Sequence, residues 1–244
     1  FVYTPDTADT PQLPLTPRQQ TLAKGGLTVN TALVPPDRST TGWINADNRE
    51  NLNYFLGHSI SNIFQLNLFT SALYKNVPQT TEYAQNFAND DSWNWRVGGK
   101  AVVFSPLRGA PFWGGGYISM GRAIDTVNVR APSYLFAETM ATLELNEKIA
   151  INLNPKLAWS GIGNLLGVGL GSNIRLSPNL ELIPETNIVL NETTQGNATL
   201  GIRWHATESF SVDVYASTAA SILDIGQLIS SDEVRFGTKI IFTF

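Results

Sequence analysis

The feature that most constrains this sequence is an alternation of apolar and polar residues that recurs in segments of roughly ten residues. It is clearest in residues 233–244, where Val234 and Phe236 share one face and Arg235 and Lys239 share the other. Alternation with a period of two is typical of a β-strand, because successive side chains point to opposite sides of a sheet. This segment therefore predicts a strand with one apolar face and one charged face.

The same pattern recurs along the second half of the chain and, less regularly, along the first half. The predicted strands cover residues 23–34, 47–57, 64–75, 95–103, 113–124, 135–145, 149–159, 166–176, 180–188, 198–204, 210–217 and 233–244. The phase is ambiguous in 113–124, where Trp113 and Tyr117 compete with Ile118 and Met120 for the apolar face. Residues 1–22 are rich in Pro, Thr, Asp and Gln and predict an extended or disordered segment.

Three features favour a membrane barrel over a soluble β-sandwich. The predicted strands reach ~10–12 residues, against ~5–6 in soluble sheets. The face opposite the apolar one combines Arg, Lys, Glu, Asn and Gly, which suits a wet lumen. Aromatic residues gather near strand ends on the apolar face, as they do at the two interfaces of a membrane. These interface aromatics are Tyr74, Trp95, Trp113, Trp159, Trp204 and Phe210.

The connections alternate between tight turns and longer loops, the longer ones being 35–46, 76–92, 125–133 and 219–232. Short turns at one rim, longer loops at the other and an even strand count are typical of bacterial outer-membrane barrels. The sequence thus predicts an all-β fold. It is a single closed antiparallel transmembrane β-barrel of about twelve strands over residues 23–244, with short periplasmic turns. The chain begins at Phe1 without an apolar leader, which fits either a removed leader or a missing start.

The last strand, VRFGTKIIFTF, resembles the C-terminal signal of Gram-negative outer-membrane barrels. That signal alternates hydrophobic residues and finishes on Phe. The resemblance implies an integral bacterial outer-membrane protein and recognition by the barrel-assembly machinery. The positions that would carry the signal are Phe236, Ile240, Phe242 and Phe244. The resemblance does not fix a function, because channels, enzymes and adhesins share this architecture.

Charged residues on the polar faces should line the lumen. The basic residues are Arg96, Lys100, Lys156, Arg175, Arg203, Arg235 and Lys239, and the acidic ones are Glu138, Glu144, Glu181, Glu185 and Asp213. Strand order would bring Arg175 near Glu181 or Glu185, and Arg203 near Asp213. Two interpretations stay open: ion pairs that stiffen a closed barrel, or the wall of an aqueous path with a slight preference for anions.

Inward glycines at 167, 169 and 171 would leave space along one wall. That space could be a pore, or it could receive loop 76–92 or the N-terminal segment as a plug. Residues 219–232 are unusually apolar for an exposed loop. They could continue the hairpin above the membrane or form a short helix over the barrel mouth.

Few residues suggest chemistry. The two histidines, His58 and His205, fall in predicted periplasmic turns without metal-ligating neighbours, and the chain has no cysteine. Gly57-His58-Ser59 lacks the strand–turn–helix context of a nucleophile elbow. The net charge of −4 argues against a nucleic-acid binder. We therefore expect no catalytic residue, no metal and no cofactor.

The functional expectation is a small passive, porin-like channel for polar or anionic solutes, surrounded by membrane lipid. The first alternative is a closed barrel that acts as a scaffold or binds a protein partner through its outer loops or residues 1–20. A hydrophobic-solute transporter, suggested by inward Phe136 and Met140, and a lipid-modifying enzyme are further alternatives. The sequence does not name the solute.

Overall fold

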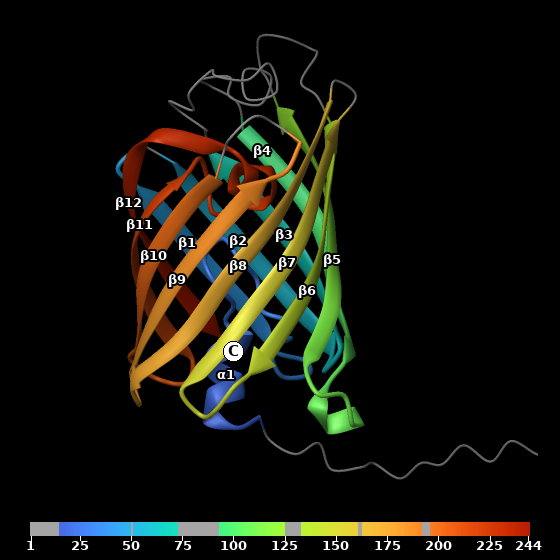
Figure 1. Cartoon of the computed structure of the whole chain (residues 1–244), viewed down its shortest axis with the longest axis vertical. Helices are drawn as coiled ribbons and strands as arrows, with labels where there is room; N and C mark the ends of the chain where they lie inside the picture. The colour runs from blue at the N-terminus through green and yellow to red at the C-terminus, as the bar shows by residue number, and fades with distance from the viewer. Residues whose placement is uncertain (1–14, 50, 73–92, 125–132, 161–162, 192–195) are drawn as a thin grey trace, which may run out of the picture.

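The protein is a closed barrel in the computed structural model, which describes residues 15–49, 51–72, 93–124, 133–160, 163–191 and 196–244 (Figure 1). Within these residues, twelve antiparallel strands pair in sequence order, and β1 pairs with β12 to close the wall. The strands are β1 (Thr40–Asp47), β2 (Leu52–Ser61), β3 (Phe64–Ala72), β4 (Trp93–Phe104), β5 (Trp113–Ile124), β6 (Ser133–Glu144), β7 (Ile149–Ser160), β8 (Gly163–Ser177), β9 (Leu180–Val189), β10 (Gly196–His205), β11 (Phe210–Ala219) and β12 (Ser230–Thr243). The short helices of the described residues are α1 (Pro17–Ala23), η1 (Pro106–Arg108) and η2 (Asp224–Leu228). The predicted fold class is confirmed.

Alternation along each strand decides which side chains face the lumen. In β10, every second residue from Asn197 to Arg203 is buried and the residues between them are exposed. In β12, Phe236 is 61% exposed whereas Arg235 is 1% exposed. A closed barrel has only two faces, so the buried, polar set lines the inside and the exposed, apolar set covers the outside.

The outside of the barrel is apolar. Every strand contributes at least one exposed large apolar side chain, such as Ile44 on β1, Leu68 on β3 and Leu200 on β10. Water would make such a surface unfavourable, whereas the hydrocarbon core of a membrane requires it. The closed ladder also pairs the backbone polar groups of the wall, as a lipid environment demands. No helix among the described residues is long and apolar enough to cross a membrane.

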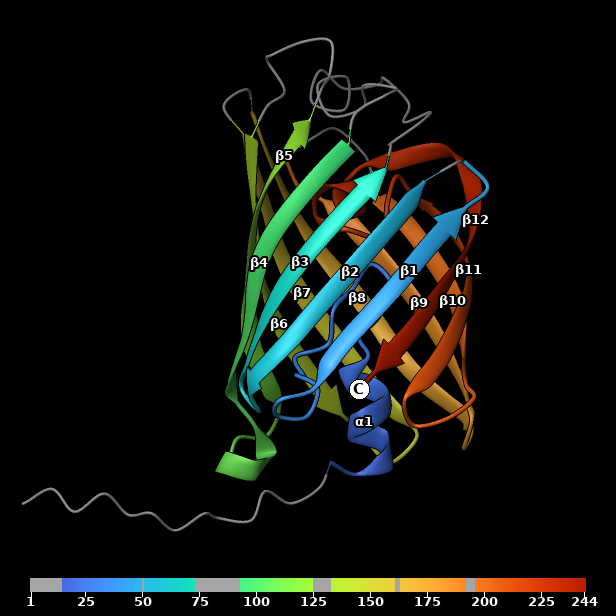
Figure 2. The same cartoon turned by 180° about the vertical axis from the view of Figure 1, so that it is seen from behind.

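The turns at one rim are short, as predicted, whereas the connection between β1 and β2 at the other rim is also short. The turns after β2, β6, β8 and β10 are short and lie at the lower rim in Figures 1 and 2, where α1 and the C-terminal Phe244 also lie. The turn after β4 at this rim contains η1. The loop predicted at 76–92 lies outside the described residues, as do residues 125–132, 161–162 and 192–195.

The predicted first strand is wrong. Residues 23–34 form no strand: α1 ends at Ala23 and the chain then runs inside the barrel to reach β1 (Figure 2). β1 occupies residues predicted as the loop 35–46, and β2 covers Leu52–Ser61 rather than 47–57. Apolar residues of 23–34, among them Leu27 and Val29, are buried inside the lumen instead of facing lipid. The alternation of apolar and polar residues indicated an extended segment with one buried side. It did not indicate whether that segment pairs with a neighbouring strand.

Part of the segment predicted as extended is helical. Thr16 caps α1: its Oγ1 accepts a hydrogen bond from the backbone of Gln19, and the Gln19 side chain accepts one from the Thr16 backbone. Pro17 follows at the first helical position, where its missing N–H costs nothing. This capping box was visible in the sequence and could have predicted the helix.

The interface aromatics separate into two groups. Trp95, Trp159 and Trp204 are at least 40% exposed on the outer face, and the Phe210 ring lies 6.0 Å from that of Phe242. Trp113 contradicts the prediction because it is only 6% exposed and faces the lumen. Three glycines follow Trp113 and a bulge interrupts its pairing with β4, so no apolar alternation fixes the phase there. Tyr74 lies outside the described residues.

Candidate functional site: the barrel lumen

The inner wall carries the charges that were predicted to line it. Arg175 and Glu144 face inward near the lower rim and are partly buried. The other predicted charges are buried on the lumen side: Arg96, Lys100, Lys156, Arg203, Arg235, Lys239, Glu138, Glu181, Glu185 and Asp213. Asp47 also faces inward and lies 3.7 Å from Arg235. Asp47 stands at the start of the strand predicted at 47–57 but was not counted among the lumen charges, and it reduces the basic excess expected on the wall.

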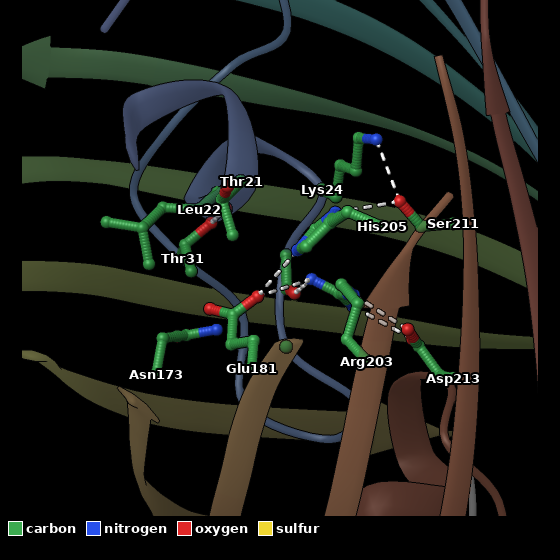
Figure 3. Close-up of polar contacts among 12 residues, drawn as sticks. Thr21, Leu22, Lys24, Thr31, Asn173, Glu181, Arg203, His205, Ser211 and Asp213 are labelled. Atoms are coloured by element: carbon green, nitrogen blue, oxygen red, sulfur yellow. Dashed lines mark hydrogen bonds and ion pairs between the residues drawn. The ribbon is translucent and has the colours of Figure 1, made fainter. Parts of the chain in front are cut away.

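An ion-pair network joins β9 to β12 across the wall. Nε and Nη2 of Arg203 donate to the two carboxylate oxygens of Asp213 at 2.7 and 2.8 Å, as Figure 3 shows. Nζ of Lys239 lies 3.3 Å from the same carboxylate, and Nη1 of Arg203 lies 3.8 Å from Glu181. Arg175 and Glu181 are register partners on β8 and β9. Both neighbour pairs expected from strand order are therefore found.

Residues 17–39, here called the plug, fill much of the lumen from the lower rim (Figure 2). The carboxylate of Glu185 accepts hydrogen bonds from the backbone of Leu27 at 2.8 Å and of Thr28 at 2.5 Å, and from Oγ1 of Thr28 at 2.8 Å. Lys156 donates to the backbone carbonyl of Thr28, and Lys239 to that of Gly26 at 3.0 Å. The wall charges thus bind the main chain of the plug.

The plug is also anchored at the rim. Arg18 pairs with Glu144 at 3.5 Å, and Arg175 donates to Oγ1 of Thr21 at 3.0 Å. Nζ of Lys24 donates to Oγ of Ser211 at 2.8 Å, beside His205 (Figure 3). Burial, reinforced by the positive charge of Arg203, lowers the pKa of Lys24 to about 8. The docked plug therefore favours the neutral form of this lysine more than water does.

Glycines on β8 and β10 make room for the plug. A Cβ atom at Gly171 would lie 3.1 Å from Cβ of Val29, and one at Gly201 would lie 2.3 Å from Cδ1 of Leu27. A Cβ atom at Gly167 would lie 2.5 Å from a methyl group of Leu228. The space at Gly171 is taken by Val29, which belongs to the segment predicted as the first strand and not to residues 1–22. The loop between β11 and β12 takes the space at Gly167.

Residues 220–229, here called the inner loop, enter the lumen from the upper rim and are all buried. Asp224 accepts hydrogen bonds from Tyr117 at 3.2 Å and from Ser119 at 2.8 Å, and lies 3.6 Å from Arg96. Burial raises the pKa of Asp224, an effect that the positive charge of Arg96 opposes. Gln227 accepts a hydrogen bond from Lys156 at 2.7 Å. Of the two expectations for this loop, the short helix η2 is the one found, and it lies within the barrel.

Between the plug and the β1–β5 side of the wall lies a cavity of about 90 Å³. Its lining includes Trp43, Phe55, Phe69 and Tyr117, whose rings form a continuous strip, the aromatic strip. The hydrogen bonds of residues 25–32 to the wall go instead to β6, β7, β9, β10 and β12. The lumen is therefore filled asymmetrically, with residual space along the aromatic strip.

The remaining predicted residues are placed as follows. Phe236, Ile240, Phe242 and Phe244 lie on the outward side of β12 and its end, and the backbone of Phe244 bonds that of Thr40. Their role in assembly stays a prediction. His58 lies on β2 and not in a turn, because that strand extends to Ser61. The part of the chain that the structure describes contains no cluster of three potential metal ligands.

No family model and no curated protein sequence matches this chain. Solved structures do. The KdgM porin in complex with disordered oligogalacturonate is similar with a TM-score of 0.61 at 9% identity, over 84% of this chain and 99% of that chain. The COG4313 outer membrane channel from Pseudomonas putida F1 is similar with a TM-score of 0.60 at 10% identity, over 87% of this chain and 98% of that chain. The fold is that of an outer-membrane β-barrel. At these identities the likeness concerns the fold alone.

Proposed function

We propose that this protein is a porin-like channel of the bacterial outer membrane for small polar or anionic solutes. In the conformation described here, the plug and the inner loop occlude the path. The observation that carries the proposal is that wall charges such as Glu185 and Lys156 bind the main chain of the plug, which is not part of the wall, rather than only one another. Withdrawal of that segment would leave these charges facing water, which solvates them well.

The fold supports this proposal in two ways. Twelve strands give a wider lumen than the ~8 strands whose side chains just fill a barrel. The similar solved structures named above include proteins described as a porin and as a channel. No described residues form a recognisable catalytic set, and the expectation that the chain is not an enzyme stays a prediction.

The second candidate is a closed barrel that serves as a scaffold or binds a protein partner. The observation that favours it is the extent of filling, since the plug and the inner loop bury much of the wall and the cavity along the aromatic strip measures about 90 Å³. The two candidates differ in one measurable respect, which is whether the plug leaves the lumen while the wall stays folded.

A reversible crosslink tests this difference. The chain has no cysteine, so Val29→Cys with Gly171→Cys would create a single pair. The Cβ atoms of the two positions would be 3.1 Å apart, a few tenths of an ångström below the usual distance in a disulfide. A small outward shift of one of them would therefore allow the bond to form. The matched control is Thr199→Cys with Ser217→Cys, which joins register partners of the wall without touching the plug.

In planar bilayers we expect reproducible conductance steps from the wild type and from the control pair. The oxidised plug crosslink should be silent, and reduction should restore the steps. Equal conductance from the oxidised and reduced plug crosslink would show that the plug does not occlude the path. A folded protein that is silent in every state would favour the closed barrel.

A further inference from the structure

Lys100 is a buried cation of the lumen that lacks a close ion pair among the described residues. Lys100 on β4 is 8% exposed, and no hydrogen bond or ion pair within 4 Å joins its ammonium group to any described residue. It has an electrostatic interaction with Glu138. The oxygens of Glu138 accept hydrogen bonds from the side chains of Asn30 and Asn154. A buried ammonium group without a hydrogen-bonded partner is costly, so this site favours an anion that can supply one.

The other lysines at the cavity are already bound. Lys239 donates to Gly26 and pairs with Asp213, and Lys24 donates to Ser211 and to the backbone of Glu208. Lys100 therefore differs from these two lysines, because the N–H groups of its ammonium group are available to a ligand. Its register partner on β3 is Gln65, which also lines the cavity and adds an amide donor beside the ammonium group.

The aromatic strip faces the same cavity. The rings of Trp43 and Phe55 stack at 5.2 Å, those of Phe55 and Phe69 lie 4.7 Å apart, and those of Phe69 and Tyr117 lie 6.3 Å apart. These side chains come from β1, β2, β3 and β5 and form an apolar platform on an otherwise polar wall. A ligand that binds here needs an anionic end for Lys100 and an apolar end for the rings.

We propose that this cavity binds a small aliphatic monocarboxylate of the size of acetate or propionate. Its carboxylate accepts hydrogen bonds from Lys100 and Gln65, and its alkyl group lies against Phe55 and Phe69. The volume of about 90 Å³ sets the size, because benzene occupies an engineered cavity of ~150 Å³ in other proteins. The inference names the solute class of the proposed channel and thus rests on that function.

Binding can be measured without conductance. The refolded protein in lipid nanodiscs would be titrated with propionate, and with propionamide as its uncharged counterpart, by saturation-transfer NMR. We expect saturable binding of propionate and much weaker binding of propionamide. Lys100→Met should weaken propionate binding roughly tenfold or more, since it removes a charge-assisted hydrogen bond. Lys148→Met, which changes an exposed lysine in the turn after β6, is the matched control and should bind like the wild type.

Heat-modifiable migration on gels would verify folding of each variant, and Lys100→Gln replaces Lys100→Met if the latter does not fold. Lys100→Arg keeps the charge and should retain most of the affinity. Equal binding of propionate and propionamide, or unchanged binding in Lys100→Met, overturns the site. Conductance without propionate binding rejects this site and keeps the channel, whereas saturable binding to a protein that never conducts keeps the site and rejects the channel.

Discussion

Replacing Glu185 with Ala should release the plug while the barrel stays closed. The Glu185 carboxylate accepts two backbone hydrogen bonds and one hydroxyl hydrogen bond from Leu27 and Thr28, and all three groups are buried. A hydrogen bond to a charged group contributes ~1.5–3 kcal/mol. Water can enter the vacated space and recover part of this loss. We therefore expect the docked state to lose about 3 kcal/mol, which is a shift of roughly 100-fold in the ratio of docked to released plug.

Single-channel recording measures this shift as open probability. The strands that flank Glu185 keep their own pairing, so the folded barrel should still migrate as a heat-modifiable band. Glu147→Gln, which changes an exposed carboxylate at the lower rim, controls for loss of charge and should behave as the wild type. A folded Glu185→Ala protein with the open probability of the wild type would refute the conclusion that this carboxylate anchors the plug.

Three further outcomes can be checked. Replacing Phe244 with Ser should impair assembly if the terminal strand is the insertion signal, and normal amounts of heat-modifiable barrel in the membrane fraction would contradict this. Replacing Arg175 and Arg203 with Ala should reduce anion preference, measured as the reversal potential in a salt gradient, and an unchanged potential would exclude both residues from selectivity. Docking lowers the pKa of Lys24 from 10.5 to about 8, so the docked plug releases a proton and docking should strengthen as pH rises through this window. Open probability should fall between pH 8 and 10, and Lys24→Met should lose this dependence.

The strands of the second half were predictable because one face is lipid and the other is polar. Leu200, Ile202 and Trp204 on β10 must meet hydrocarbon while Arg203 must not, and this difference is large enough to fix both the strand and its phase. The pairing of Arg203 with Asp213 followed from strand order alone. The apolar residues on the lipid-facing side of the strands were therefore the best guide to the strands and their phase.

The path of residues 24–39 inside the barrel was not predictable, because the environment of this part of the plug is mixed. Val29 is buried against the wall while the adjacent Thr28 bonds to Glu185, which produces a strand-like alternation without a strand. The sequence indicated only that glycines such as Gly171 leave space, and several segments could have filled it. β1 was missed for the opposite reason, since Ile44 is the one large residue among its outward residues Gly42, Ile44 and Ala46, and the lumen-facing Trp43 is apolar too.

The position of the plug has a consequence for the order of assembly. Gly26 is bound by Lys239, a residue 213 positions further along the chain, and Gly25 by Arg203. The surface that receives this segment is thus completed by strands that are synthesised after most of the wall. Contacts of such sequence separation form late. The contact of Gly26 with Lys239 therefore forms only once β12 is in place, so its formation reports that the last strand has joined the wall.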